Sequence, residues 1–191
     1  MYYYTMNENP NESEYNYDAT KGDLVIMNAV VIWPDFSGRR SMQAFHATTR
    51  SCNVIVNDEL AQVLRENHIN VKERATEDGN FYYIAAKLSY HTPEDEVRLG
   101  FKPTDPDVKL KRVQNGEVNM IHMTQDDVAE LDSIKVQRCD LVLHHGKKLN
   151  QNGYFTLYIS KMGSVYEVND PFGGMYDDVP AAPVEEEEMP F

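Results

Sequence analysis

The chain has 191 residues, 41% of them hydrophobic, and a formal net charge of −13. This composition fits one globular domain with tails, and no apolar run approaches membrane-spanning length. So negative a total would exclude a nucleic-acid binder if the charge were evenly spread, because such proteins neutralise phosphates with Lys and Arg. However, residues 1–20 carry −4 and residues 169–191 carry −7, which leaves −2 for the body between them. The acidity therefore belongs to the tails, and the body can still present a basic face.

The first twenty-one residues are rich in Asn, Glu and Tyr and show no periodicity, which predicts a disordered acidic leader over 1–21. The fold is expected to start near Gly22. The stretch Asp23–Trp33 is almost wholly apolar and β-branched, which predicts one long buried strand that ends in a turn at 34–38. Trp33 ends this strand and is therefore assigned to the core rather than to a binding surface.

A second strand is predicted over Cys52–Val56, followed by a short helix. Asn57 is a suitable N-cap for that helix, and the acidic residues after it suit the helix dipole. The inner face of the helix is expected to carry Leu60, Ala61 and Leu64.

Beyond Gly79, the stretch 81–91 alternates as a strand does. One face is apolar and is assigned to the core, whereas the other carries Phe81, Tyr83 and Lys87 in a row suited to stacking unpaired bases.

The sequence of the second half of the body predicts further short strands and one short helix, separated by loops. An Asn152-Gly153 turn signal joins two of the strands as a hairpin. The elements are a strand at 97–101, a loop at 102–112, a short helix at 124–131, and strands at 139–145, 154–159 and 165–168. Many short strands and few helices predict a mainly β fold, a five-stranded barrel of the oligonucleotide-binding (OB-fold) type over residues 22–168. Residues 169–191 are expected to be a disordered acidic tail.

Neither metal nor covalent chemistry is indicated by the sequence. Cys52 and Cys139 lie in apolar, strand-like contexts, so we expect reduced core thiols in a cytoplasmic protein and no disulfide. His144-His145 lacks the spacing of a zinc site, and no phosphate loop or nucleophile elbow is present. The acidic run at 126–132 is most simply a solvated helix face, although a magnesium-dependent nuclease would also use such residues. We therefore expect no cofactor and no enzyme activity.

The last seven residues, Glu185-Glu186-Glu187-Glu188-Met189-Pro190-Phe191, place four carboxylates beside an apolar tip with the terminal carboxylate. Such a segment cannot fold alone, but a partner pocket lined by Arg or Lys could hold its charges and bury the ring of Phe191. The tip resembles that of bacterial single-stranded DNA-binding proteins, in which an acidic tail ending in Pro-Phe recruits replication and repair enzymes. The resemblance implies a partner-binding tail.

Aromatic residues in the body are interleaved with cations, the pattern with which proteins stack bases and neutralise phosphates without reading sequence. We take the following residues as candidates for binding single-stranded DNA. They are Phe36, Arg39, Arg40, Arg50, Lys72, Tyr83, Lys87, Arg98, Phe101, Lys102, Lys147 and Lys148.

Over residues 24–160 the order of short segments also resembles a bacteriophage single-stranded DNA-binding family. The resemblance begins with an apolar strand running into Asp35-Phe36-Ser37-Gly38 and continues through Arg50 and 54–61 to Asn70-Val71-Lys72. Further matching segments follow in the same order: 84–90, Arg98, Leu131-Asp132 and Asp140-Leu141. The resemblance implies a protein of the host cytoplasm that coats single strands during replication, recombination or repair, possesses no catalytic residue, and can form homo-oligomers.

Two other functions are consistent with the sequence. An interaction module or DNA-mimic inhibitor of a host enzyme is suggested by the isoelectric point of about 4.8. Mimicry, however, requires acidic residues fixed on the folded surface, whereas the body here is close to neutral. A metal-dependent nuclease is suggested only by the acidic run at 126–132.

Overall fold

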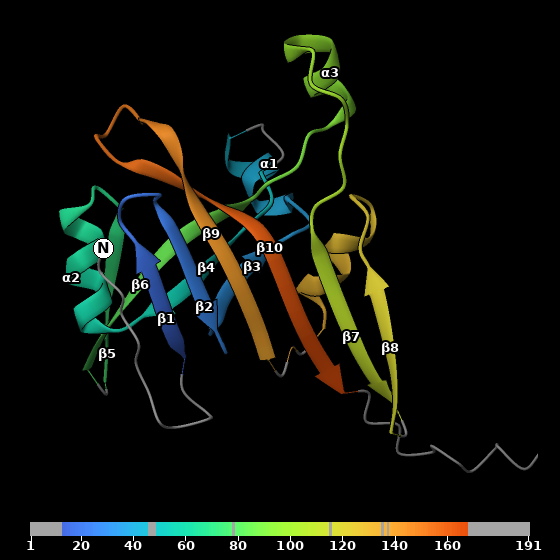
Figure 1. Cartoon of the computed structure of the whole chain (residues 1–191), viewed down its shortest axis with the longest axis horizontal. Coiled ribbons are helices and arrows are strands. Elements are labelled where there is room, and N and C mark those ends of the chain that lie inside the picture. Colours follow the sequence, from blue (N-terminus) through green and yellow to red (C-terminus); the bar gives the residue numbers. More distant parts are fainter. Residues whose placement is uncertain are drawn as a thin grey trace, which may run out of the picture.

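The computed structural model describes residues 13–45, 49–77, 79–114, 116–134, 136 and 138–167. Strands dominate these residues and the helices are short (Figure 1), which confirms the predicted mainly β class. The elements are β1 (Glu14–Asp18), β2 (Asp23–Met27), β3 (Val31–Asp35), α1 (Arg39–Phe45), β4 (Ser51–Val56), α2 (Asp58–Glu66), β5 (Val71–Thr76), β6 (Gly79–Leu88), α3 (Pro93–Leu99), β7 (Val108–Gln114), β8 (Glu117–His122), the 3-10 helix η1 (Asp127–Asp132), β9 (Arg138–Leu149) and β10 (Phe155–Glu167).

Strand β10 is the branch point of the sheet, whose main path is β1-β2-β9-β10-β6-β4-β3. Its residues Leu157–Ile159 pair with β6, and after a register shift its residues Met162–Glu167 pair with β7 instead. The sheet therefore divides into two arms, one made of β6, β4, β3 and β5, the other of β7 and β8. Within the described residues no pairing joins β1 to β3. The closed barrel expected from the sequence is thus replaced by an open, branched sheet.

The core is formed by the sheet together with α2 and η1. Alternate residues of the central strands are fully buried, including Leu141 and Leu143 of β9 and Ile84 of β6. The side chain of Asn57 accepts a hydrogen bond from the Leu60 backbone N–H at 2.9 Å, so the predicted N-cap is confirmed. Leu60, Ala61 and Leu64 are buried on the inner face of α2, also as predicted. This helix packs on β5 and β6, the strands that carry the candidate site on their other face.

Residues 14–18 are part of the fold, so the prediction that the domain starts near Gly22 is wrong for this segment. They form β1, which pairs with β2 and buries Tyr15 and Tyr17. The alternation of Tyr15, Asn16 and Tyr17 has the period of two that a half-buried strand requires, and the acidic neighbours hide it in the composition. The rest of the expected leader, residues 1–12, lies outside the described residues.

Two further elements differ from the sequence prediction because local backbone effects override hydrophobicity. The long strand expected over 23–33 is broken at Asn28, which has a left-handed φ of 52°, and its halves are β2 and β3. The strand expected over 97–101 is instead the end of α3. Thr92 and Asp95 form a capping box, and Pro93 occupies the first helical turn, where its missing N–H costs nothing.

Several weakly patterned segments also form elements that the sequence did not predict. These are α1, the exposed strand β5, strand β8, and β7, which begins within the expected loop 102–112 and extends beyond it. The hairpin with the Asn152-Gly153 turn signal is confirmed, and its strands, β9 and β10, are longer than predicted. The short helix expected over 124–131 corresponds to η1.

Both cysteines are free and buried, and burial raises the pKa of each thiol, so both stay protonated near neutral pH. In the part of the chain that the structure describes, no helix has the length and apolar character needed to cross a membrane. Within the same residues no group of three or more His, Cys, Asp or Glu side chains is placed to hold a metal ion.

Candidate nucleic-acid interface

Strands β4, β5 and β6 present one continuous face of rings, cations and small polar groups. Lys72 lies opposite Tyr83, Arg74 lies opposite Phe81, and Ser51 lies opposite Lys87. Directly opposed residues of antiparallel strands point to the same side of a sheet, so these side chains share a face. Ile84 and Ala86 of β6 are buried on the other side. The two faces of β6 predicted from the sequence are confirmed.

Three aromatic rings cluster on this face. The centroid of Trp33 lies 5.2 Å from that of Tyr83 in an edge-to-face arrangement and 6.3 Å from that of Phe81. The centroids of Phe81 and Tyr83 are 5.9 Å apart. The Arg74 guanidinium lies over the indole, with its central carbon 4.9 Å from the ring centroid. We call Trp33, Phe81, Tyr83 and Arg74 the aromatic platform.

Trp33 is 37% exposed, so its assignment to the core is wrong. Its φ is 46°, a left-handed value that is costly for a bulky residue, and it lies where the β3–β4 register shifts between Ile32 and Asp35. A bulge of this kind re-aims a side chain. The strained backbone therefore turns Trp33 onto the face that carries Tyr83 and Phe81. A regular continuation of the apolar strand would have placed Trp33 in the core.

A hollow runs beside the platform, lined by Trp33, Asp35, Arg40, Ser41, Ser51, Asn53, Lys72 and Tyr83. A second hollow continues from it through the shared residues Ser51 and Lys72. Its lining also includes Asn70, Lys87, Asn150 and Phe155. We call the two together the binding groove. The groove brings together Arg40, Lys72, Tyr83 and Lys87, four residues proposed from the sequence.

The one carboxylate in the groove lining is not free to repel an anion. Asp35 is only 7% exposed, and its side chain accepts hydrogen bonds from the backbone N–H groups of Arg40 and Ser41 at 3.3 and 3.2 Å. It thus fixes the start of α1, which presents Arg40 to the groove. The groove is therefore cationic where its side chains face solvent.

The row of polar and aromatic residues continues across β10 and β9. Tyr158 is the register partner of Lys87, and His144 is the register partner of Tyr158. The His144 and Tyr158 rings are stacked, with centroids 5.7 Å apart. Sequence reasoning missed both residues because β6 and β10 are distant in the chain, and only their parallel pairing aligns Lys87 with Tyr158.

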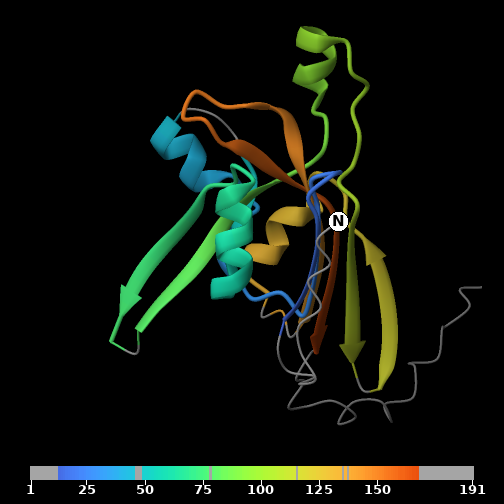
Figure 2. The same ribbon diagram turned by 60° about the vertical axis from the view of Figure 1, so that its left-hand side comes forward.

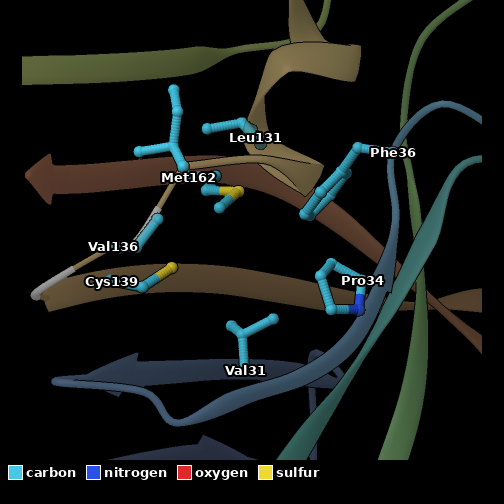
Figure 3. A pocket seen from close by; sticks show the side chains of 8 residues that line it. Val31, Pro34, Phe36, Leu131, Val136, Cys139 and Met162 are labelled. Carbon is cyan, nitrogen blue, oxygen red and sulfur yellow. The ribbon is translucent and has the colours of Figure 1, made fainter.

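Phe36 is 1% exposed, so the expected stacking ring in an exposed turn is wrong. The backbone N–H groups of Phe36 and Ser37 donate to the two carboxylate oxygens of Asp132 at 2.8 and 2.9 Å. These bonds tie the turn to η1 and fold the ring inward. Figure 3 shows Phe36 turned toward Leu131 and Met162 in an apolar pocket. The residue belongs to the core and is not available to a base.

Arg50 is a structural residue rather than a groove residue. Its guanidinium donates to the backbone carbonyl of Gln125 and lies over the Tyr90 ring, 5.4 Å from the centroid. Burial raises the pKa of Tyr90, and the positive charge of Arg50 acts in the opposite direction. The guanidinium thus joins the start of β4 to the segment before η1, outside the lining of the groove.

The remaining candidates are spread over three other places. Arg39 is exposed on α1, and Lys147 and Lys148 are exposed at the end of β9, close in the chain to groove residue Asn150. Arg98 pairs with Asp95 at 3.0 Å on α3, and the Phe101 ring stacks on His91. Lys102 follows them in an exposed loop. Figure 1 shows α3 projecting away from the strands that carry the groove, so these three residues are not brought to it.

The proposed partner-binding residues of the tail, 185–191, lie outside the described residues.

Comparison with known proteins points to one family. A family model described as a putative phage ssDNA-binding domain matches residues 15–189. The chain is also similar to the solved single-stranded DNA-binding protein of bacteriophage Enc34 in complex with ssDNA, at 11% identity and a TM-score of 0.46, covering 89% of this chain and 98% of that one. A C-terminal truncation of the Enc34 protein gives 11% identity and a TM-score of 0.40, with coverage of 89% and 97%. No curated protein matches the chain.

Proposed function

The chain belongs to the family of putative phage ssDNA-binding domains, and from this premise we propose that it coats single-stranded DNA through the binding groove and the aromatic platform. It performs no covalent chemistry and acts in the host cytoplasm, wherever replication, recombination or repair exposes single strands. The observation that carries this proposal is the partly exposed Trp33 ring, turned by a strained bulge onto Tyr83 and Phe81 beside a cationic groove.

The groove supplies both interactions that a single strand offers. Each unpaired base that stacks on an exposed ring gains about 1–3 kcal/mol, whichever base it is. Arg40, Lys72 and Lys87 provide positive charges along the same line for the phosphates. Ser51 and Asn53 add hydrogen-bonding groups between them. Stacking of this kind requires bases that are not already stacked in a duplex, so the groove favours single strands.

A fluorescence anisotropy titration with labelled oligo-dT, the matching duplex and oligo-U tests this function. We expect tight binding of oligo-dT at low salt and much weaker binding of the duplex. Absence of oligo-dT binding by the full chain, and also by the chain without residues 185–191, would overturn the proposal. The oligo-U arm shows whether the groove distinguishes DNA from RNA.

Neutralising Lys72 is expected to weaken oligo-dT binding and to reduce its salt dependence. Each phosphate contact on a single strand contributes about 0.7 to the slope of log K against log salt. The Lys72→Gln chain should therefore lose about 0.7 from the slope measured over a series of NaCl concentrations. Lys21→Gln is the matched control, since Lys21 lies in the β1–β2 turn and pairs with Asp18. Equal slopes for the Lys72→Gln and unmodified chains would place Lys72 outside the interface.

We further propose that the acidic tail recruits replication or repair proteins and competes with DNA for the groove. The support is its composition, four glutamates followed by Met189, Pro190 and Phe191, against a cationic groove. Removing residues 185–191 is expected to raise affinity for short oligo-dT at low salt, with the gain fading as salt screens the competition. A chain with all four glutamates replaced by glutamine should behave like the deletion. An affinity unchanged by either alteration across the salt series would refute the competition.

A further inference from the structure

Two protrusions expose large apolar side chains far from the groove. The first is α3 with the residues after it, where Val97 is 90%, Leu99 53% and Phe101 51% exposed. The second is the β7–β8 hairpin, where Val118 and Met120 are 53% and 57% exposed. Exposed apolar residues clustered in this way indicate surfaces that contact another molecule. Nothing in the proposed base stacking or phosphate binding requires either protrusion.

The α3 protrusion, residues 93–101, is acidic and firmly held; we call it the acidic knob. It carries Glu94, Asp95 and Glu96 with only Arg98 as a cation, a net charge of −2. The Thr92–Asp95 capping box fixes the start of the helix, and Gly100 ends it in a left-handed conformation. No residue of α3 is buried. The helix is therefore ordered by its own caps and not by packing against the core.

The base of the knob is also fixed. The Phe101 ring stacks on His91 with centroids 4.9 Å apart. The Gln125 side chain donates to the backbone carbonyls of both His91 and Thr104, which form an isolated β-bridge below the knob, at 2.9 and 2.8 Å. A rigid, exposed apolar knob loses little conformational entropy when it docks, which favours its use as a contact surface.

The β7–β8 hairpin, residues 108–122, has the opposite charge; we call it the basic hairpin. It carries Lys109, Lys111 and Arg112 against Glu117, a net charge of +2. Lys111 lies opposite Met120, and two residues along on the same face Val113 lies opposite Val118. Lysine and exposed apolar side chains thus share one face of a hairpin that has no strand beyond β8 among the described residues.

The acidic knob and the turn of the basic hairpin lie at opposite ends of the molecule. Figure 1 shows α3 above the sheet and the β7–β8 turn below it, and Figure 2 shows the same separation after rotation. The knob of one molecule therefore cannot reach the turn end of its own hairpin, where Val113 lies opposite Val118, although Lys109 lies at the other end of the hairpin. We propose that the acidic knob of one copy docks on the basic hairpin of the next copy bound to the same single strand. The proposal rests on the proposed function, since the strand is what aligns the copies.

A contact between two different surfaces of identical molecules does not close after two copies but continues as a row. The strand raises the effective concentration of neighbours, so a contact that is weak in solution becomes effective on DNA. Opposite charges set the orientation, and the apolar side chains add buried area. The expected consequence is cooperative loading on long strands.

Charge exchange tests this contact. The variants are Glu94→Lys with Glu96→Lys, Lys109→Glu with Lys111→Glu, and the chain with all four changes. Oligo-dT lengths that hold one copy and two copies are first determined by native mass spectrometry. For each variant we then measure affinity for the one-copy length and the ratio between second-copy and first-copy affinities on the two-copy length.

Each two-residue exchange is expected to lower the cooperativity ratio about tenfold, because like charges then face each other across the contact. Affinity for the one-copy length should stay within about twofold, and the chain with all four changes should regain the ratio because the charges again match. Failure of the four-residue chain to regain cooperativity overturns the contact. A loss of one-copy affinity confined to the Lys109→Glu, Lys111→Glu chain would instead assign the hairpin to DNA. Absence of one-copy binding by the unmodified chain would contradict the proposed function, which is a separate result.

Discussion

Replacement of Trp33 by alanine is expected to lower the affinity for oligo-dT by about 1–3 kcal/mol, roughly 5-fold to 150-fold, if one base stacks on the indole. The Trp33→Ala, Tyr83→Ala chain should lose more than either single variant but less than the sum of the two losses, because each ring also positions the other. The centroids of the two rings are 5.2 Å apart in an edge-to-face arrangement. Trp33→Phe should retain part of the affinity, since a smaller ring still offers a face to a base.

Trp33 is the one tryptophan of the sequence, so its fluorescence reports on the platform directly. Stacking of a base on the indole should quench this signal in proportion to the bound fraction measured by anisotropy. Tyr82→Ala is the matched control, because Tyr82 lies next to Tyr83 on β6 but on the other face, where Arg65 covers its ring. Thermal unfolding of each variant separates a loss of binding from a loss of folding. A quench that does not follow binding, with full affinity in Trp33→Ala, would remove the platform from the interface.

The part of the proposed interface that lies on one strand could be predicted from the sequence. Period-two alternation placed Phe81, Tyr83 and Lys87 on one face, and the structure confirms that face. The residues that complete it come from other strands. Arg74 joins through the β5–β6 register and Tyr158 through a parallel pairing with a strand seventy residues away in the chain. Pairing register is a long-range property, and no local pattern encodes it.

The candidates that proved structural share a different cause. Phe36 and Arg50 have the residue types that bind DNA, but each is engaged by a group far along the chain, Asp132 and Gln125 respectively. A ring in a short turn is exposed unless a distant carboxylate anchors the turn, and such an anchor leaves no mark on the local sequence. Conversely, the sequence predicts that Trp33 is a core residue because it ends an apolar strand. In the structure, a backbone bulge exposes it.

The fold shows the same division between local and long-range signals. The Asn57 cap and the Asn152-Gly153 hairpin were predicted because their chemistry is contained within a few residues. The change of partner along β10, from β6 to β7, was not predicted, and this change opens the expected barrel into two arms.

The charge of the exposed groove argues against the DNA-mimic alternative. Mimicry requires a fixed acidic surface, but the groove presents Arg40, Lys72 and Lys87.

Replacement of Tyr17 by alanine is expected to destabilise the domain by about 3–5 kcal/mol, the usual cost of removing a buried aromatic ring. Tyr17 is 2% exposed and lies opposite Leu24, which is fully buried on β2. A loss of that size is a large fraction of the 5–15 kcal/mol that stabilises a typical domain, so the variant should show a clearly lower midpoint in urea. Asn16→Ala is the matched control, since Asn16 is exposed on the same strand and its loss should stay within about 0.5 kcal/mol.

The same result decides where the domain begins. If residues 14–18 were a solvated leader, as their acidic composition indicates, Tyr17→Ala and Asn16→Ala would unfold at the same urea concentration. If β1 is integral, Tyr17→Ala alone is destabilised, and a chain that starts at Gly22 should lose the strand that covers the edge of β2. Uncovered edges pair with other chains, so this truncated protein should aggregate at concentrations where the full chain stays monodisperse. Size-exclusion chromatography with light scattering checks this, and a monodisperse, fully stable truncation would show that the fold does not need β1.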